Sequence, residues 1–157
     1  LFLVMVVLLL KETGDDNIWL PATLAVRYGL QCVGTVNSVD LKENLRYLFS
    51  GKKQIAICPV QETCDSAEVL RKLESFAGDA EERKWCVIPS PLLCPEGAEH
   101  LRGAEAILLV VKAGAHVGKQ LEYALDFLAR QECRVTAALL WDADEKLLRR
   151  YYGFTRR

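Results

Sequence analysis

The amino-acid sequence predicts an α/β fold, in which a small doubly wound, mostly parallel sheet lies between two layers of helices. Four short apolar segments are nearly continuous rather than alternating, which is typical of strands buried on both faces of a parallel sheet. Segments with helical periodicity lie between them, and such alternation implies right-handed crossovers. The length of 157 residues, 51 % of them hydrophobic, suits one globular domain with a short appendage and excludes a wholly disordered chain.

Two helices and a short extended segment are expected in the first third of the chain. A helix is predicted over residues 18–30, because Pro21 lies near its start and Gly29 at its end. Residues 32–36 have the composition of a short extended segment. A second helix is predicted over residues 41–49, where apolar side chains at positions 41, 45, 48 and 49 share one helical face.

The rest of the chain alternates between strand and helix patterns. The predicted strands are the four nearly continuous apolar segments, at residues 54–60, 85–89, 104–113 and 134–141. A helix over residues 63–76 is predicted to bury a stripe made of Ala67, Leu70, Leu73 and Phe76. A helix over residues 117–130 has its apolar face at Leu121, Ala124, Leu125 and Leu128. Residues 143–152 are expected to close the fold as a terminal helix.

The first ten residues, Leu1 to Leu10, are all apolar. As a helix they would extend about 15 Å, half of a bilayer core of ~30 Å, so they could not cross a membrane alone. The favoured interpretation is the end of a transmembrane helix. A buried strand and the apolar part of a signal peptide are the alternatives. No small-residue cleavage site follows, which argues against the signal peptide.

The cysteines occur singly and form no metal-binding motif. They are Cys32, Cys58, Cys64, Cys86, Cys94 and Cys133. No C-x-x-C pair occurs, and neither His100 nor His116 has ligand spacing to a pair of cysteines, so no zinc site is expected. We expect buried, reduced thiols that behave as small apolar residues, as in proteins inside the cell.

The charge of the chain is balanced. Twenty basic and 21 acidic residues give a formal net charge of −1. Nucleic-acid-binding domains normally carry a basic stripe, so this balance gives no reason to expect a nucleic-acid partner.

The loop after the predicted strand 54–60 is where a phosphate site would lie. Ligands of doubly wound sheets bind outside the carboxyl ends of the strands, and a glycine-rich loop with a lysine would cradle phosphates there. The residues at this place are Gln61, Glu62, Thr63, Cys64, Asp65, Ser66 and Ala67. They include no glycine and no lysine, and their two carboxylates would repel phosphate. The sequence therefore predicts a degenerate loop and no nucleotide cofactor.

A metal-holding aspartate at the end of a later strand is the other part of such a site. Pro89 stands at that place, and proline has neither a charge nor an N–H group. We therefore expect no metal site and no catalytic residue in this chain.

The order of the elements resembles the cytoplasmic part of bacterial tyrosine kinases and polysaccharide co-polymerases, the chain-length regulators of capsule and exopolysaccharide synthesis. The resemblance is carried by residues 18–24, 28–30, 33–36, 45–49, 104–114, 120–125 and 151–154. It covers nearly the whole chain and depends on pattern and order more than on one specific motif. The chain departs from the family at Gln61–Ala67 and at Pro89. In addition, residues 67–85 are too few for the strand that carries the family's second aspartate motif.

The resemblance implies a Rossmann-like, three-layer domain derived from the P-loop NTPase fold. It implies a division into residues 1–12 as the stub of a transmembrane helix, 13–38 as a juxtamembrane segment and 39–157 as the degenerate α/β domain. The implied location is the cytoplasmic face of the bacterial inner membrane.

Two further sets of residues have possible roles under this resemblance. Active members of the family oligomerise through a helix with a glutamate and two arginines spaced three apart. Glu43 and Arg46 match this pattern, but Phe49 stands at the third position; a solvated ion pair is the alternative. Tyr151 and Tyr152 resemble the family's C-terminal tyrosine cluster and could accept phosphate. We favour instead that they pack the terminal helix on the sheet.

The function expected from these observations is that of a non-catalytic interaction domain on a membrane-anchored polysaccharide chain-length regulator, without a cofactor. Its partners would be further copies of the chain, a tyrosine kinase or the polysaccharide polymerisation machinery. One alternative is a divergent nucleotide-binding, kinase-like domain. Another is a soluble adaptor of the deviant-Walker type, unrelated to polysaccharide.

Overall fold

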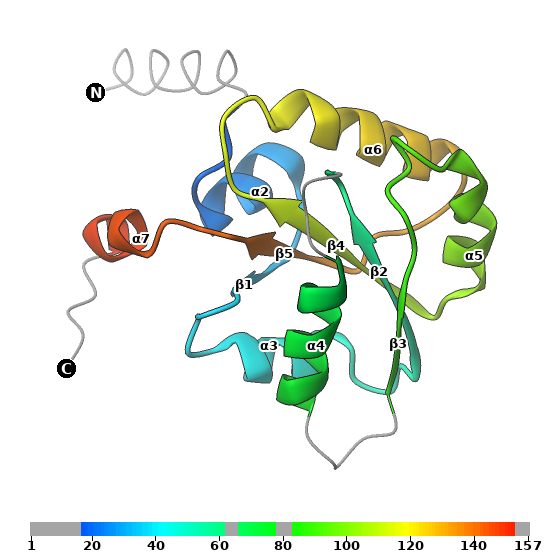
Figure 1. Cartoon of the computed structure of the whole chain (residues 1–157), viewed down its shortest axis with the longest axis horizontal. Helices are drawn as coiled ribbons and strands as arrows, with labels where there is room; N and C mark the ends of the chain where they lie inside the picture. The colour runs from blue at the N-terminus through cyan, green and yellow to red at the C-terminus, as the bar shows by residue number, and fades with distance from the viewer. Residues whose placement is uncertain (1–16, 62–65, 78–82, 153–157) are drawn as a thin grey trace.

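One parallel sheet organises the molecule. The computed structural model describes residues 17–61, 66–77 and 83–152. Its five strands lie in the order β1-β5-β4-β2-β3, and every neighbouring pair is parallel. Helices cover both faces (Figure 1). The predicted α/β fold with a small doubly wound, parallel sheet is therefore confirmed.

The strands are short and each overlaps a predicted segment. They are β1 (Cys32–Thr35), β2 (Gln54–Pro59), β3 (Lys84–Val87), β4 (Ala106–Lys112) and β5 (Ala137–Trp141). Strands β4 and β5 are buried along nearly their whole length, because both of their faces are covered by helices. This explains why their sequences are continuous apolar runs rather than alternating ones.

The described helices have the following bounds. They are α2 (Pro21–Tyr28), α3 (Leu41–Leu48), α4 (Ser66–Ala77), α5 (Ala98–Gly103), α6 (Gly118–Arg130) and α7 (Glu145–Tyr152), with a short 3₁₀ turn, η1 (Pro95–Gly97), before α5. The sequence did not predict η1 and α5. Helix α5 has only six residues and buries Ala98 and Leu101, too few positions to set up a helical period.

The two hydrophobic cores lie on opposite faces of the sheet. On one face, Leu24 of α2, Leu101 of α5 and Leu121 of α6 pack against alternate residues of the strands. On the other face, Leu45 of α3 and Leu73 of α4 do the same. The arrangement is a three-layer α/β/α sandwich.

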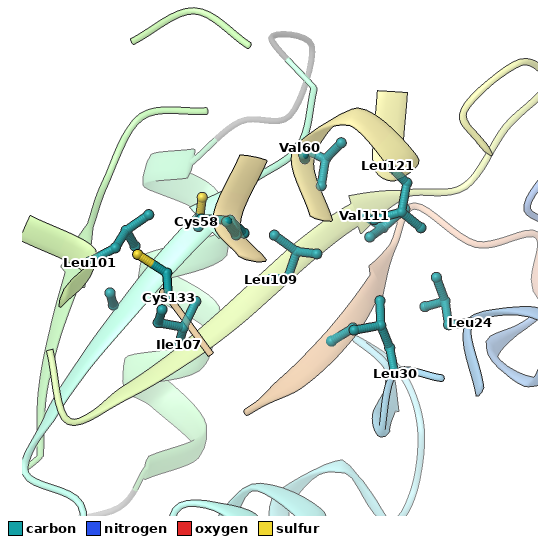
Figure 2. Close-up of a cluster of buried hydrophobic side chains, with 14 of the residues drawn as sticks. Leu24, Leu30, Cys58, Val60, Leu101, Ile107, Leu109, Val111, Leu121 and Cys133 are labelled. Atoms are coloured by element: carbon teal, nitrogen blue, oxygen red, sulfur yellow. The ribbon is translucent and has the colours of Figure 1, made fainter. Parts of the chain in front are cut away.

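Strand β4 contributes to both cores. Its residues Leu108, Leu109, Val110 and Val111 are fully buried, and successive side chains point to opposite faces. Figure 2 shows Leu109 and Val111 on the face that also receives Cys58 and Val60 from β2.

Helix α4 buries a different stripe from the predicted one. Val69 and Leu73 are buried, whereas Ala67 is exposed and Leu70 is half-buried. The side chain of Phe76 lies outside the described part of the chain. The prediction was wrong because positions spaced by three drift around a helix of 3.6 residues per turn, whereas a pair spaced by four stays on the face that contacts the sheet.

The first described helix begins later than predicted. Residues 18–20 are not helical; Ile18 instead forms an antiparallel bridge with Gly114, with both N–H···O distances at 2.9 Å. Pro21 begins α2, and Gly29 ends it at φ 65°, a left-handed conformation that glycine adopts without strain. Both end signals were read correctly from the sequence.

Within the described residues, no helix is long and apolar enough to cross a bilayer. The expected membrane-helix stub at residues 1–12 lies outside those residues, so this finding does not bear on it.

Truncation of Leu109 tests the central position of β4. Leu109→Ala would leave a cavity between the central strand and α6, and we expect the free energy of unfolding to fall by about 3 kcal/mol. Urea denaturation followed by circular dichroism measures this loss. Val39→Ala is the control, because the Val39 side chain is fully exposed and its truncation should leave the midpoint unchanged. Equal losses in the two variants would contradict the burial assigned to β4.

Candidate functional site

The carboxyl ends of β2 and β4 form the topological switch point of the sheet. The chain leaves β2 through α4, on one face of the sheet, and reaches β3. It returns from β3 to β4 through α5, on the opposite face. Helices α4 and α5 cover opposite faces of the sheet. Doubly wound folds bind ligands in the crevice that opens at this point. The candidate site is therefore the edge formed by residues 60–61, 90 and 112.

Gln61 closes the gap between the two strand ends. Its side chain is 7 % exposed; Nε2 donates to the carbonyl oxygen of Lys112, and the N–H of Lys112 donates to Oε1, both at 3.0 Å. The side-chain amide therefore makes the two bonds that a further strand residue would make. It continues the β2–β4 ladder beyond Val60, whose own N–H donates to Val110. The first residue of the loop is therefore hydrogen-bonded to β4.

Ser90 closes the same edge from the side of β3. It is 2 % exposed, and its hydroxyl donates to the carbonyl oxygen of Val60 at 2.7 Å and accepts the N–H of Leu92 at 3.2 Å. Pro89, at the place of the expected aspartate, is exposed. The sequence did not indicate a role for Ser90. Its one sequence signal was a small polar residue directly after an apolar strand, which is also an ordinary turn signal.

The remaining residues of the degenerate loop divide into two groups. Glu62, Thr63, Cys64 and Asp65 lie outside the described residues. Ser66 is the first residue of α4 and is half-buried. The acidic character of the loop is known from its sequence. The closed edge beside the loop is formed by the hydrogen bonds of Gln61 and Ser90.

Two lysines near this edge contact carboxylates of the fold. Lys112 Nζ lies 4.0 Å from Asp142 Oδ2, after β5. Lys72 Nζ lies 3.7 Å from Glu68 Oε1 and 5.3 Å from the centre of the Trp141 ring. An anion at the switch point would have to compete with these partners.

Glu43 and Arg46 lie on the exposed face of α3. Their side chains are 3.6 Å apart and more than half exposed, which leaves both the ion pair and an interface role open. Phe49 is fully buried and meets Trp85 edge-on, with ring centres 6.0 Å apart. The third position of the family's oligomerisation pattern therefore belongs to the core.

Tyr151 lies near the end of α7 and is 60 % exposed. The prediction that it packs the terminal helix on the sheet is therefore wrong for this residue. Helix α7 leaves the sheet after Trp141 and extends away from the body of the domain, which explains the exposure (Figure 1). Tyr152 ends the helix, and its side chain lies outside the described part.

The cysteines differ in exposure, although uniform burial was predicted. Cys58 and Cys133 are buried, Cys32 and Cys94 are half-buried, and Cys86 is exposed. Burial raises the pKa of Cys58 to about 12, with a smaller contribution from neighbouring Cys133, so this thiol stays protonated at neutral pH. Cys86 departs from the prediction because it lies on the edge strand β3, beside a groove. Cys64 lies outside the described residues.

That groove runs between β3 and α5, toward the amino ends of the strands. It has a volume of about 340 Å³ and is lined by Lys84, Cys86, Ile88, Glu99, His100 and neighbouring residues of β2 and α5. It does not include Gln61 or Ser90, so it is separate from the switch point. Among the residues that the structure describes, no three His, Cys, Asp or Glu side chains come together as metal ligands.

Neither protein-family models nor curated proteins give a relative of this chain. No protein-family model matches the sequence, and no curated protein matches it. The function is therefore argued from the chain itself.

Removal of the Gln61 side chain tests how firmly the switch point is closed. Gln61→Ala would leave the N–H and carbonyl of Lys112 without these bonds, and we expect a loss of about 2 kcal/mol in the free energy of unfolding. Urea denaturation measures it. Gln54→Ala is the matched control, since Gln54 is exposed at the start of the same strand. A loss no larger than that of the control would show that the amide does not hold the edge.

Proposed function

We propose that this chain is a non-catalytic interaction domain of a membrane-anchored polysaccharide chain-length regulator, located at the cytoplasmic face of the membrane. Its fold resembles a nucleotide-binding fold, but its role is contact with other proteins. Further copies of the chain, a tyrosine kinase or the polymerisation machinery are the proposed partners.

The observation that carries the proposal is the pair of bonds between Gln61 and Lys112. A phosphate cradle needs backbone N–H groups that are free to point at the ligand. Here the Gln61 side chain binds β4 and the Ser90 hydroxyl binds the Val60 carbonyl, so the chain is held at the edge of the sheet where such a loop would begin. The residues that follow contain no glycine and no lysine, and Glu62 and Asp65 add negative charge. The composition and the charge of the loop both disfavour phosphate.

The assignment to polysaccharide regulators is supported by the resemblance of the sequence. The alternatives are a divergent nucleotide-binding domain and a soluble adaptor. They make different predictions for two measurements.

Calorimetric titration with Mg-ATP and Mg-ADP separates the interaction domain from the nucleotide-binding domain. We expect no heat of binding and no shift of the melting temperature at millimolar nucleotide, because the loop sequence has no glycine or lysine and Glu62 and Asp65 would repel phosphate. Under the alternative, Glu62 and Asp65 would hold the magnesium ion. The double variant Glu62→Gln/Asp65→Asn would then abolish binding, whereas Glu99→Gln on α5 would not. Micromolar binding by the unaltered chain would overturn our proposal.

The coding sequence upstream of Leu1 separates the polysaccharide regulator from the soluble adaptor. A regulator of this kind should have an extracytoplasmic domain and a first membrane helix before the apolar segment Leu1–Leu10. Sequencing the gene on the 5′ side tests this expectation. A soluble domain directly upstream, with no membrane helix, would remove the polysaccharide assignment and leave the adaptor.

A further inference from the structure

Three large apolar side chains are exposed at the carboxyl edge of the sheet, on the side of β1 and β5. Trp19 is 41 % exposed, Val39 is fully exposed and Tyr151 is 60 % exposed. They belong to three segments: the residues before α2, the β1–α3 loop and α7. Exposed apolar residues scattered singly need no explanation, but a group of them at one edge is typical of a contact surface.

Hydrogen bonds hold these three segments to the same edge. Ile18, next to Trp19, pairs with Gly114 just beyond β4. Ala113 donates in turn to the carbonyl of Trp141, from which the chain continues to α7. In the β1–α3 loop, Asn37 donates to the Glu145 carboxylate in the first turn of α7. Figure 1 shows α7 and the start of α2 on the same side of the molecule.

The charges of the later part of α7, where Arg149 and Arg150 lie in the last turn, favour an anionic partner. Two acids of this edge are engaged within the fold: Asp144 accepts the N–H groups of Lys146 and Leu147, and Glu145 lies 3.4 Å from Arg149. Lys146 and Arg150 are exposed on α7, and neither forms an ion pair with a described residue. The opposing exposed acids at this edge include Asp40 in the β1–α3 loop and Asp142 after β5, which lies 4.0 Å from Lys112.

The length of chain before Asn17 limits where this edge can lie. Leu1–Leu10 are all apolar, and only six residues, 11–16, separate them from Asn17. Six residues span at most about 20 Å when fully extended. If the apolar segment lies in a bilayer, Trp19 is therefore close to the membrane surface.

We propose that the surface formed by Trp19, Val39, Tyr151, Lys146 and Arg150 rests on an anionic lipid membrane. Tryptophan and tyrosine side chains favour the headgroup region because their rings are apolar and their N–H or O–H group stays in contact with water. The two cations lie over lipid phosphates, and the apolar side chains enter the interface. This inference rests on the proposed function, because it takes Leu1–Leu10 as a membrane anchor.

Quenching of tryptophan fluorescence by brominated lipids tests the surface in the full chain. The chain is reconstituted into phosphatidylcholine vesicles with or without phosphatidylglycerol, both containing lipid brominated near the headgroup. Trp85 and Trp141 are each 8 % exposed, so Trp19 should supply the quenched emission. We expect quenching in the anionic vesicles that disappears in Trp19→Phe and persists in Trp85→Phe.

A charge variant tests the role of α7. Lys146→Glu/Arg150→Glu should weaken the surface contact about tenfold, seen as weaker quenching than in the parent chain at the same low salt concentration. Arg130→Glu/Arg134→Glu is the matched control, because these exposed arginines lie at the opposite edge, between α6 and β5, and their replacement should change nothing.

Each other result overturns the inference in a different way. If the chain stays in the vesicles but Trp19 is not quenched, the surface does not face lipid, and the proposed function is unaffected. If quenching is absent and the chain forms dimers that Trp19→Phe dissociates, the surface binds a second copy. If the chain does not enter vesicles at all, the membrane anchor in the proposed function fails as well.

Discussion

The parallel pairing of β4 with both β2 and β5 is the contact on which the rest of the structure depends. β4 hydrogen-bonds to a neighbour along each edge and contributes Leu108 and Val110 to one core and Leu109 and Val111 to the other. Every helix layer packs on side chains that this pairing holds in register. Burial on both faces also demands an unbroken apolar sequence, which is why the strand was easy to find.

The same pairing decides what can happen at the switch point. The carboxyl ends of β2 and β4 lie side by side, so the chain after Val60 must either turn away to form a ligand loop or continue the ladder. Gln61 continues it with its side chain. A buried amide with both of its groups bonded stabilises the edge, whereas the same groups left unpaired would cost free energy. A ligand at this place would have to break both bonds.

The sequence predicted the features that depend on local pattern. Continuous apolar runs identified four of the five strands, residues 32–36 were expected as a short extended segment, and Pro21 and Gly29 marked the ends of α2, because these signals act within a few residues. It failed where the partner is distant. Nothing near Gln61 indicates Lys112, which is 51 residues away, and nothing near Ile18 indicates Gly114. The sequence did not predict helix α5, because its two buried positions are too few to define a helical period. The exposure of Tyr151 depends on where α7 leaves the sheet, which is a property of the whole fold.

The balanced net charge has a consequence for any contact with an anionic surface. A chain with a formal charge of −1 is not attracted to such a surface as a whole, so attraction must come from charges placed within about a Debye length of it, roughly 8–10 Å. Lys146 and Arg150 meet this condition on α7 only if that helix faces the lipid. Asp144 and Glu145 oppose this attraction, but their contacts, the cap on α7 and the pair with Arg149, hold them at the start of the helix, away from Arg150. Apolar contact by Trp19, Val39 and Tyr151 then determines how closely the edge approaches, while the two cations determine its orientation. Salt should therefore weaken the contact without abolishing it, because ions screen the two cations but leave the burial of apolar surface intact.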